Sequence, residues 1–249
     1  MRVAILSDIH GFDLAFREVL NDIDRNGPFD RIVVAGDLCV IGPKPDDVVR
    51  IVRDRGLLAL KGNTDRDLVE AARTGVSDPE FDYAANRLGP DGLAFLDALP
   101  FEIRVSPPDG RGPADDLLVV HANPQNLDDA LDPELPDKQL LERIGPAEAA
   151  MIAFGHIHIC YVRQVGPYLL MDVAAVGNSK NGDISSKWGI ATWDATTRRW
   201  SAELRLVPYP MEATEAEIIR CGVPSAGKVI RKLKQASYKG RGGDDGPES

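Results

Sequence analysis

The alternation of short apolar runs with helix-periodic segments in about the first 75 residues constrains the fold more than any other feature of the chain. Three runs are short, continuous and apolar, as expected of strands that are buried on both faces: VAILSD, RIVVAGD and LLALKGN. Apolar residues at helical spacing separate the first two runs until NGP ends the pattern at Asn26–Pro28, and PDDVVRIVRDRG repeats that spacing before the third run. Three strand–helix units predict a parallel sheet with crossover helices.

The rest of the chain mixes both kinds of element. Helical spacing is present in DRDLVEAARTG and DGLAFLDALP, and again near the C-terminus in ATEAEIIRCG and AGKVIRKLKQA. Strands are predicted in FEIRV, DLLVVHA and AAMIAFGH, and then in a consecutive antiparallel series from CYVRQVG onward, with a turn near Asp194–Thr197. We expect a single domain over residues 1–238, followed by a polar, glycine-rich and disordered tail at 239–249.

Composition excludes several classes of protein. The formal charge of −10 argues against binding along a nucleic-acid duplex, which needs a surplus of Lys and Arg. The one basic stretch, KVIRKLKQASYKGR, is interpreted as a docked amphipathic helix with a cationic outer face rather than a nucleic-acid patch. The three cysteines lack metal-ligand or disulfide-framework spacing. We expect neither a leader nor a membrane span, because the N-terminal residues show no cleavage pattern and no apolar run approaches about 20 residues. We therefore expect a cytoplasmic protein with no membrane partner and no long nucleic acid as ligand.

Polar residues with metal-binding side chains follow the predicted strands. Ligands of open α/β sheets collect outside the carboxyl ends of the strands. Each histidine taken alone could be an ordinary surface residue, but all four histidines of the chain occupy such positions. The complete set is Asp8, His10, Asp37, Asn63, His121, His156 and His158.

This set is too large for a single tetrahedral ion and large enough for two divalent ions that share a carboxylate. Oxygen and nitrogen ligands without thiolate suit Mn, Fe or Zn better than Ca. Two such ions about 3.5–4 Å apart would clamp a phosphate and lower the pKa of a bridging water from 15.7 to about 7. Hydrolysis of a small phosphoester is the predicted reaction.

Five ordered sequence blocks, SDIHG, GDLC, GNTD, VVHANP and GHIH, resemble those of the calcineurin-like metallophosphoesterases. The resemblance spans at least residues 1–180 and is greatest to the compact bacterial and archaeal branch that hydrolyses phosphodiesters. It implies an α/β fold, a four-layer α-β-β-α sandwich of two mixed sheets. It leaves a homo-oligomer open, since compact members of the family often self-associate.

The resemblance also implies roles for the polar residues. Asp8, His10 and His158 would bind one ion and Asp37 would bridge, while Asn63, His121 and His156 would complete the shell of the second ion. Asp37, Asn63 and His121 are the predicted catalytic residues. The implied cofactor is a pair of divalent ions, with Mn expected and Fe, Zn, Ni or Mg as alternatives, because the same ligands accept several metals.

One block departs from the family pattern. Thr64 occupies the place where many monoesterases of the family carry a histidine that serves the leaving group, so we expect a phosphodiesterase. Thr64 is also interpreted as a helix cap, with Asp67 returning the bond. The predicted substrate contacts are Thr64, Arg66, Asn178 and Lys180. For the two cations, Arg66 and Lys180, solvated surface charge is the favoured alternative to a substrate contact.

Two alternatives remain from the sequence. The first is a phosphatase that acts on monoesters, phosphoproteins or dinucleoside polyphosphates. The second belongs to another class: a non-catalytic protein-binding scaffold on the same fold, as in a retromer subunit. The complete set of seven predicted ligands argues against a scaffold, because pseudoenzymes typically lose such residues.

Overall fold

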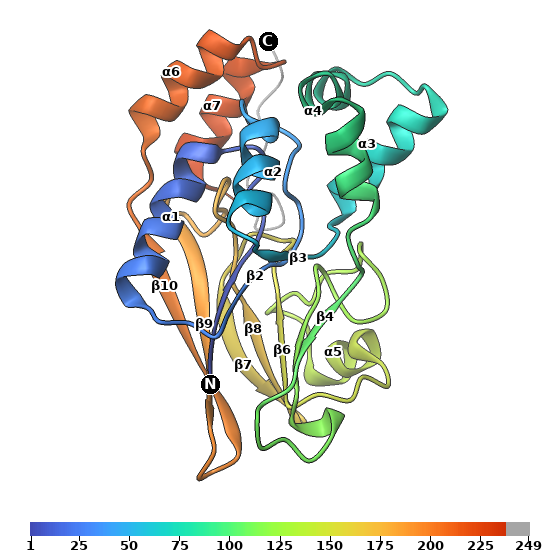
Figure 1. Cartoon of the computed structure of the whole chain (residues 1–249), viewed down its shortest axis with the longest axis vertical. Coiled ribbons are helices and arrows are strands. Elements are labelled where there is room, and N and C mark those ends of the chain that lie inside the picture. Colours follow the sequence, from blue (N-terminus) through green and yellow to red (C-terminus); the bar gives the residue numbers. More distant parts are fainter. Residues whose placement is uncertain (238–249) are drawn as a thin grey trace.

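The computed structural model describes residues 1–237 and arranges its strands in two mixed five-stranded sheets (Figure 1). The first sheet has the strand order β10-β9-β1-β2-β3. Its strands are β1 (Arg2–Leu6), β2 (Arg31–Val34), β3 (Leu58–Ala59), β9 (Ser186–Asp194) and β10 (Arg199–Val207). The first three run parallel, as predicted from the strand–helix units, and β9 joins the sheet antiparallel to both β1 and β10.

The second sheet has the strand order β4-β5-β6-β8-β7. Its strands are β4 (Ile103–Val105), β5 (Leu117–Val119), β6 (Met151–Phe154), β7 (Tyr161–Val165) and β8 (Tyr168–Asp172). The central strands β5, β6 and β8 run parallel, and the edge strands β4 and β7 pair antiparallel to them. The carboxyl ends of β1, β2 and β3 therefore meet at one edge of the first sheet. The carboxyl ends of β5, β6 and β8 likewise meet at one edge of the second sheet.

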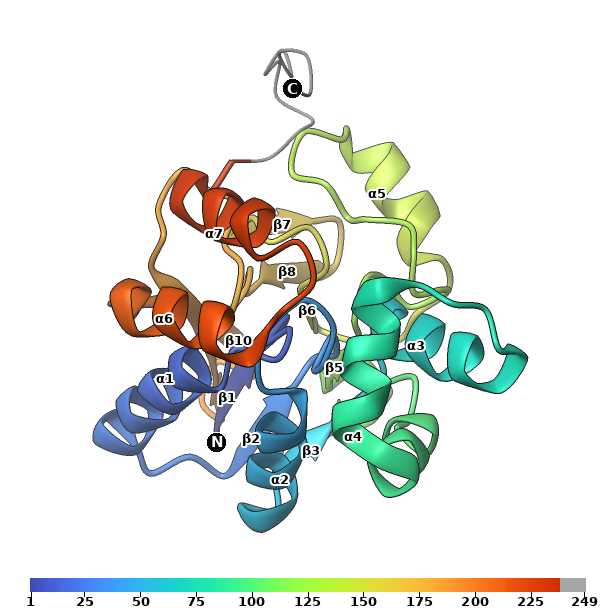
Figure 2. The same cartoon turned by 90° about the horizontal axis from the view of Figure 1, so that it is seen from above.

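Helices cover the outer faces of both sheets, which confirms the four-layer fold (Figures 1 and 2). The first sheet is covered by α1 (Asp13–Asn26), α2 (Pro45–Asp54), α6 (Met211–Cys221) and α7 (Ala226–Gln235), and the second by α5 (Asp137–Ile144). Beside them, α3 (Asn63–Thr74) packs against α4 (Pro79–Asp97). None of the helices within residues 1–237 has the length and apolar character needed to cross a membrane.

Alternating side chains of β1 belong to different parts of the core. Val3 and Ile5 lie between the two sheets, whereas Ala4 and Leu6 face the helices. This two-residue period explains why β1 is continuously apolar, since a strand with both faces covered has no exposed position. Complete burial of a Val, Ile or Leu side chain contributes about 1.5–3 kcal/mol, so the inner strands fix the position of the loops that follow them.

Three sequence predictions differ from the structure. The predicted consecutive antiparallel series is wrong at one step, because β8 and β9 belong to different sheets. Helix α4 begins well before the predicted segment and bends at Gly89, where φ is 61° and Pro90 follows. Helix α5 was not predicted, because it has only eight residues and its apolar pattern is short. The turn after Asp194 is confirmed, but the predicted disordered tail at 239–249 lies outside the described residues.

Candidate metal centre

The seven predicted ligands come from both sheets and meet where the strands end. Viewed from above, these strand ends lie at the centre of the molecule and are surrounded by α2, α4 and α7 (Figure 2). The first sheet contributes Asp8 and His10 after β1, Asp37 after β2 and Asn63 at the start of α3. The second sheet contributes His121 after β5, and His156 and His158 after β6. The structure thus brings together residues that are up to 150 positions apart in the chain (158 − 8).

The backbone at these strand ends is strained. A left-handed conformation costs an L-residue about 1–2 kcal/mol, and such residues persist only where the surrounding structure holds them. Five of the seven predicted ligands have a positive φ: Asp8 (55°), His10 (53°), Asp37 (54°), His156 (78°) and His158 (64°). Sharp turns after the strands therefore direct several side chains toward one point.

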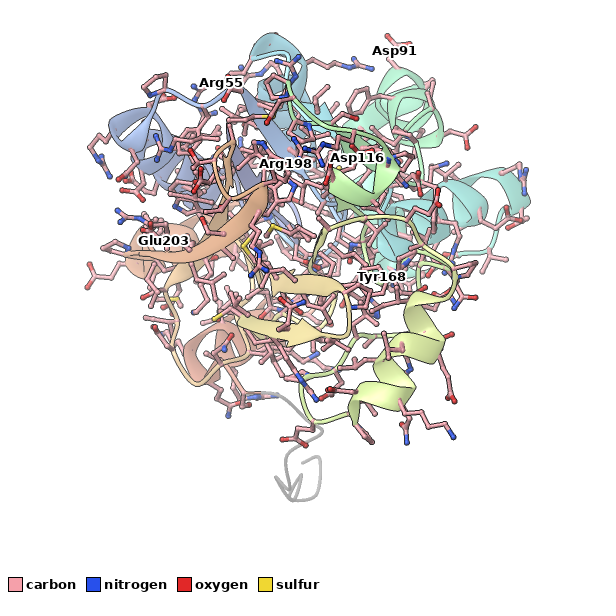
Figure 3. All side chains as sticks on the ribbon, turned by 90° about the horizontal axis from the view of Figure 1, so that it is seen from below. Arg55, Asp91, Asp116, Tyr168, Arg198 and Glu203 are labelled. Atoms are coloured by element: carbon pink, nitrogen blue, oxygen red, sulfur yellow. The ribbon has the colours of Figure 1, made fainter. Side chains whose placement is uncertain are left out.

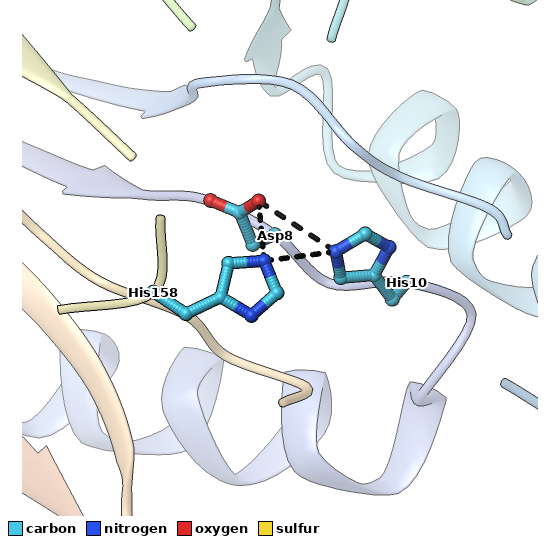
Figure 4. Close-up of side chains that lie close together, drawn as sticks. All are labelled: Asp8, His10 and His158. Carbon is cyan, nitrogen blue, oxygen red and sulfur yellow. Dashed lines mark hydrogen bonds and ion pairs between the residues drawn. The ribbon is translucent and has the colours of Figure 1, made fainter. Parts of the chain in front are cut away.

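The first cluster consists of Asp8, His10 and His158, all of which are buried (Figure 4). The Asp8 Oδ1 atom lies 3.0 Å from His158 Nε2 and 3.6 Å from His10 Nε2. The two Nε2 atoms are 3.1 Å apart. One carboxylate oxygen and two ring nitrogens thus face a common point.

Backbone carbonyls determine which ring nitrogens of this cluster carry a proton. His10 Nδ1 lies 3.0 Å from the carbonyl oxygen of Val40, and His158 Nδ1 contacts that of Asn178. A carbonyl oxygen only accepts hydrogen bonds, so both Nδ1 atoms donate and both Nε2 atoms of the neutral rings present lone pairs. Asp8 Oδ1 is buried without a hydrogen-bond partner among the described residues. With both rings neutral, three lone-pair donors converge at this point, an arrangement that fits a metal ion.

The second cluster is built in the same way from Asn63, His121 and His156. His121 Nδ1 lies 2.8 Å from the Ala35 carbonyl oxygen, and His156 Nε2 lies 2.9 Å from that of Asp128. The opposite nitrogens, His121 Nε2 and His156 Nδ1, lie 2.9 and 3.1 Å from Asn63 Oδ1. These three atoms also face one another with lone pairs, which again fits a cation.

Asp37 lies between the two clusters. Its Oδ2 atom is 3.7 Å from His10 Nε2 of the first cluster, and its Oδ1 atom is 3.6 Å from His121 Nε2 of the second. The Oδ1 atom also accepts a hydrogen bond of 2.9 Å from the Thr64 amide. Among the predicted ligands, Asp37 offers one carboxylate oxygen to each cluster.

Charges within the centre shift its pKa values in opposite directions. Burial disfavours the ionised Asp8 carboxylate, but His158 and His10 outweigh it and hold the pKa of Asp8 well below its usual range. Burial also opposes protonation of His10 and His121, yet Asp8 and Asp37 raise the pKa of both rings. Protons therefore compete with a metal for these rings, so we expect metal affinity to increase with pH.

The other two histidines behave differently. Burial lowers the pKa of His156, and the neighbouring His121 lowers it further. Burial likewise lowers the pKa of His158, against the opposing effect of Asp8. Both rings are therefore held in the neutral form that a metal ion binds.

Asp172, the last residue of β8, is a buried carboxylic acid close to this centre. Burial raises its pKa well above the usual value, Asp8 adds to the effect, and Oδ2 has no partner among the described residues. The folded state therefore binds a proton that the unfolded state releases, and stability falls as pH rises above the unfolded pKa of about 3.9.

Asp172→Asn keeps an oxygen for the amide of Ala174 and cannot ionise. We expect its gain in Tm over the wild type, measured in EDTA by circular dichroism, to increase from pH 4 to pH 8. A gain that is independent of pH would contradict this.

The predicted cap at Thr64 is wrong. Helix α3 begins at Asn63, two residues earlier than the capping interpretation required, and Gly62 is its N-cap residue. Asp65 therefore occupies the third helical position, and its Oδ2 accepts a hydrogen bond of 3.0 Å from the Gly62 amide. Thr64 Oγ1 is instead buried without a partner among the described residues, and Asp67 binds Arg66.

Asp65 is a residue of the centre that sequence reasoning missed. It is completely buried, and its Oδ1 atom accepts a hydrogen bond of 2.9 Å from the amide of Leu38, next to Asp37. Burial, reinforced by the charge of Asp37, raises the pKa of Asp65 to about 6. Asp65 thus joins the loops that carry Asp37 and Asn63. The signal that could have found it is the acidic residue three positions after Gly62.

The predicted substrate contacts are placed in different ways. Arg66 is held by Asp128 through hydrogen bonds of 2.8 and 2.9 Å, so its guanidinium supports the loop whose carbonyl orients His156. Asn178 orients His158 through its backbone carbonyl. Lys180 lies at this side of the centre, where burial lowers its pKa and the charge of Asp8 raises it.

Two mixed sheets between helices, with carboxylates and imidazoles converging at the strand ends, define a metallophosphoesterase. The sequence model of the calcineurin-like phosphoesterase superfamily domain matches residues 1–195. The chain therefore belongs to this family. Membership implies divalent metal ions. Two groups of buried side chains are candidate ligands for them: Asp8, His10 and His158, and Asp8, Asp37 and His121.

Two curated proteins are similar to parts of this chain in sequence. An uncharacterized protein from Methanocaldococcus jannaschii is 27% identical over 183 residues, which is 68% of this chain and 67% of that protein. A symmetrical bis(5'-nucleosyl)-tetraphosphatase from Paracidovorax citrulli is 33% identical over 125 residues, 49% of this chain and 44% of that protein.

Two crystal structures share the fold over nearly the whole chain. A metallophosphoesterase from Sphaerobacter thermophilus has a TM-score of 0.74 and 21% identity, with 95% of this chain and 100% of that chain covered. A hypothetical protein from Pyrococcus horikoshii OT3 has a TM-score of 0.78 and 16% identity, with 95% and 99% covered.

Proposed function

We propose that the chain is a dinuclear metal-dependent phosphodiesterase that hydrolyses small phosphodiesters. The observation that supports it most is the convergence of imidazole nitrogen atoms with carboxylate and carboxamide oxygen atoms from both sheets, with Asp37 facing both clusters. We place the enzyme in the cytoplasm, since the cysteines of the described chain are all unpaired, as is usual in a reducing compartment.

We propose an ion for each residue from the position of its donor atom. Asp8, His10 and His158 would hold the first ion, Asn63, His121 and His156 the second, and Asp37 both. When bound, a pair of divalent ions acts as a Lewis acid toward the phosphate and lowers the pKa of a bound water. Mn is the expected ion, and Fe, Zn, Ni and Mg are alternatives that the same ligands accept.

The protein's own groups position the reaction. The carbonyls of Val40, Ala35 and Asp128 hold three of the four imidazoles in a fixed tautomer and orientation, so little reorganisation accompanies substrate binding. The Lys180 ammonium offers positive charge for a phosphate oxygen on the first-cluster side. The hydroxyl of Thr64 is a far weaker acid than an imidazolium, so a poor alkoxide leaving group would lack a proton donor there.

Thr64→His tests the preference for diesters. The added imidazole supplies a general acid next to Asp37, and general acids contribute about 10²–10⁴-fold to such reactions. We expect the ratio of diesterase to monoesterase activity to fall at least about tenfold. The measurement is turnover of a chromogenic phosphodiester and of the matching monoester, with Mn²⁺ or with EDTA. An unchanged ratio would show that Thr64 does not set the preference.

A tetraphosphatase is the second candidate function. It is favoured by the 33% identity, over about half of this chain, to a symmetrical bis(5'-nucleosyl)-tetraphosphatase. Turnover of a dinucleoside tetraphosphate that exceeds turnover of simple diesters would select this candidate. Failure to hydrolyse any ester with metal bound would instead favour the protein-binding scaffold.

A further inference from the structure

A cavity of about 50 Å³ lies beside the first metal cluster. Two of the loops around it also orient ligands of that cluster: Asn178 contacts His158, and Val40, next to Ile41, contacts His10. A water needs about 10–15 Å³ by the same measure, so the space accommodates a phosphate-sized group. The cavity is lined by Ile41, Glu80, Asn178, Lys228, Val229, Lys232 and Leu233, and we call it the basic cleft.

Helix α7 provides the cationic wall of the basic cleft. Val229 and Leu233 are buried and dock the helix, as the amphipathic pattern predicted, while Lys228 and Lys232 are exposed one turn apart on the same face. Two like charges at this spacing disfavour a helix. The hydrogen bond of 2.7 Å from the Gly182 amide to the Ala236 carbonyl joins the end of α7 to the loop that contains Asn178 and Lys180.

The lysines of this region differ from the others in residues 1–237. The chain has 39 acidic and 29 basic residues, so carboxylate partners are abundant. Five described lysines form an ion pair: Lys44, Lys61, Lys138, Lys187 and Lys234. The other three, Lys180, Lys228 and Lys232, have no carboxylate within 4.0 Å among the described residues. Two of these line the cleft, and the third lies two residues from Asn178.

Other groups complete the cleft. The Asn178 carboxamide makes no hydrogen bond within the described chain, so it is free to contact a ligand. Ile41 has φ of 101°, an unusual value for a β-branched residue, as found where the local structure serves a site. Glu80 is the one carboxylate of the lining, and no ion pair joins it to Lys228 or Lys232 within the described chain.

We propose that the basic cleft binds a second phosphate group of the substrate, while the scissile phosphate occupies the metal centre. This inference rests on the proposed phosphoesterase function and specifies its substrate: a small phosphoester that carries at least one further phosphate. Unpaired ammonium groups and a free carboxamide are ligands for phosphate oxygens. The formal charge of −10 favours a small ligand over a long nucleic acid.

Two substrates that differ by one phosphate test the proposal on the Mn²⁺-loaded full chain: the p-nitrophenyl ester of thymidine 5'-phosphate, with and without a 3'-phosphate. We expect the wild type to have the lower KM for the 3'-phosphorylated ester. In the double variant Lys228→Gln/Lys232→Gln this advantage should fall about tenfold or more. Glu80→Gln should increase the KM advantage of the 3'-phosphorylated ester, because it removes the negative charge of the lining. Lys234→Gln, the same change on the same helix at a lysine paired with Glu215, is the control and should have no effect.

A binding measurement separates failure of the cleft from failure of the enzyme. Thymidine 3',5'-bisphosphate is titrated calorimetrically into the full chain in EDTA, where turnover plays no part. Binding that the double variant weakens about tenfold supports the cleft even if no ester is hydrolysed. The proposal would be overturned if the wild type did not bind the bisphosphate. It would also be overturned if the double variant changed the KM of both esters equally. An affinity for oligonucleotides that increases with their length would overturn it in favour of a nucleic-acid ligand.

Discussion

Asp37→Asn lowers kcat/KM for a chromogenic phosphodiester about a thousandfold or more in our expectation, because the substitution affects both metal clusters at once. Asparagine retains an oxygen that can accept the hydrogen bond from the Thr64 amide, so the loop keeps its local support. It removes the negative charge, however, and replaces one of the two oxygens that face His10 and His121 with an amide nitrogen that has no lone pair to offer. Steady-state turnover with added Mn²⁺ measures the effect.

Asp116→Asn is the matched control for this substitution. Asp116 is also a buried aspartate, but it precedes β5 at the opposite end of the sheet and pairs with Arg104 at 3.3 Å (Figure 3). We expect it to lower thermal stability and to retain turnover per folded molecule. Equal loss of activity in both variants would show that Asp37 acts through folding alone.

Gly62→Ala has the second largest expected effect, because Gly62 packs directly against Asp37. A Cβ atom at this position would lie well under 3.0 Å from Asp37 Oδ1 and from the Asp37 amide nitrogen, so the backbone must move. The next residue is Asn63, which means that both ligands shift together. Misplacement by about 1 Å can cost a factor of 10² in rate, and overpacking costs about 1–3 kcal/mol of stability. We expect both losses, measured as kcat/KM and as the free energy of unfolding in urea.

Gly227→Ala provides the comparison. A Cβ atom at Gly227 meets no other atom within 4 Å, and the residue lies inside α7. Alanine should therefore increase stability by about 0.5–1 kcal/mol and leave turnover unchanged. Full activity and an unchanged free energy of unfolding in Gly62→Ala would contradict the tight packing that we describe around Asp37.

Local periodicity was sufficient to predict the first strand–helix units of the fold. The strands β1 and β2 and the helices α1 and α2 follow from apolar spacing and clear stop signals. Long-range pairing was not predictable in this way: β9 pairs with β1 through partners such as Arg2 and Thr192, and nothing in either strand specifies the other. The same reason explains why β8 and β9 were assigned to one antiparallel series although they lie in different sheets.

The convergence of the candidate ligands could be predicted from the sequence, because these residues follow strands and strand ends converge in this architecture. The seven predicted ligands do meet in the structure. What sequence could not provide is the surrounding support. The carbonyls of Val40, Ala35, Asp128 and Asn178 set the histidine tautomers, and backbone carbonyls have no sequence signal. A shift of two residues in the start of α3 moved the N-cap from the predicted Thr64 to Gly62, and the carboxylate that returns the bond from Asp67 to Asp65.

The number of metal ions bound per chain is the most direct test of a dinuclear centre. The full-length protein is stripped with EDTA, dialysed against Mn²⁺ and analysed for metal content, and the same samples are assayed with a chromogenic phosphodiester. We predict two Mn²⁺ ions per wild-type chain and turnover that appears only with bound metal. One ion or none in a folded chain, or turnover that persists in EDTA, would contradict the dinuclear phosphodiesterase.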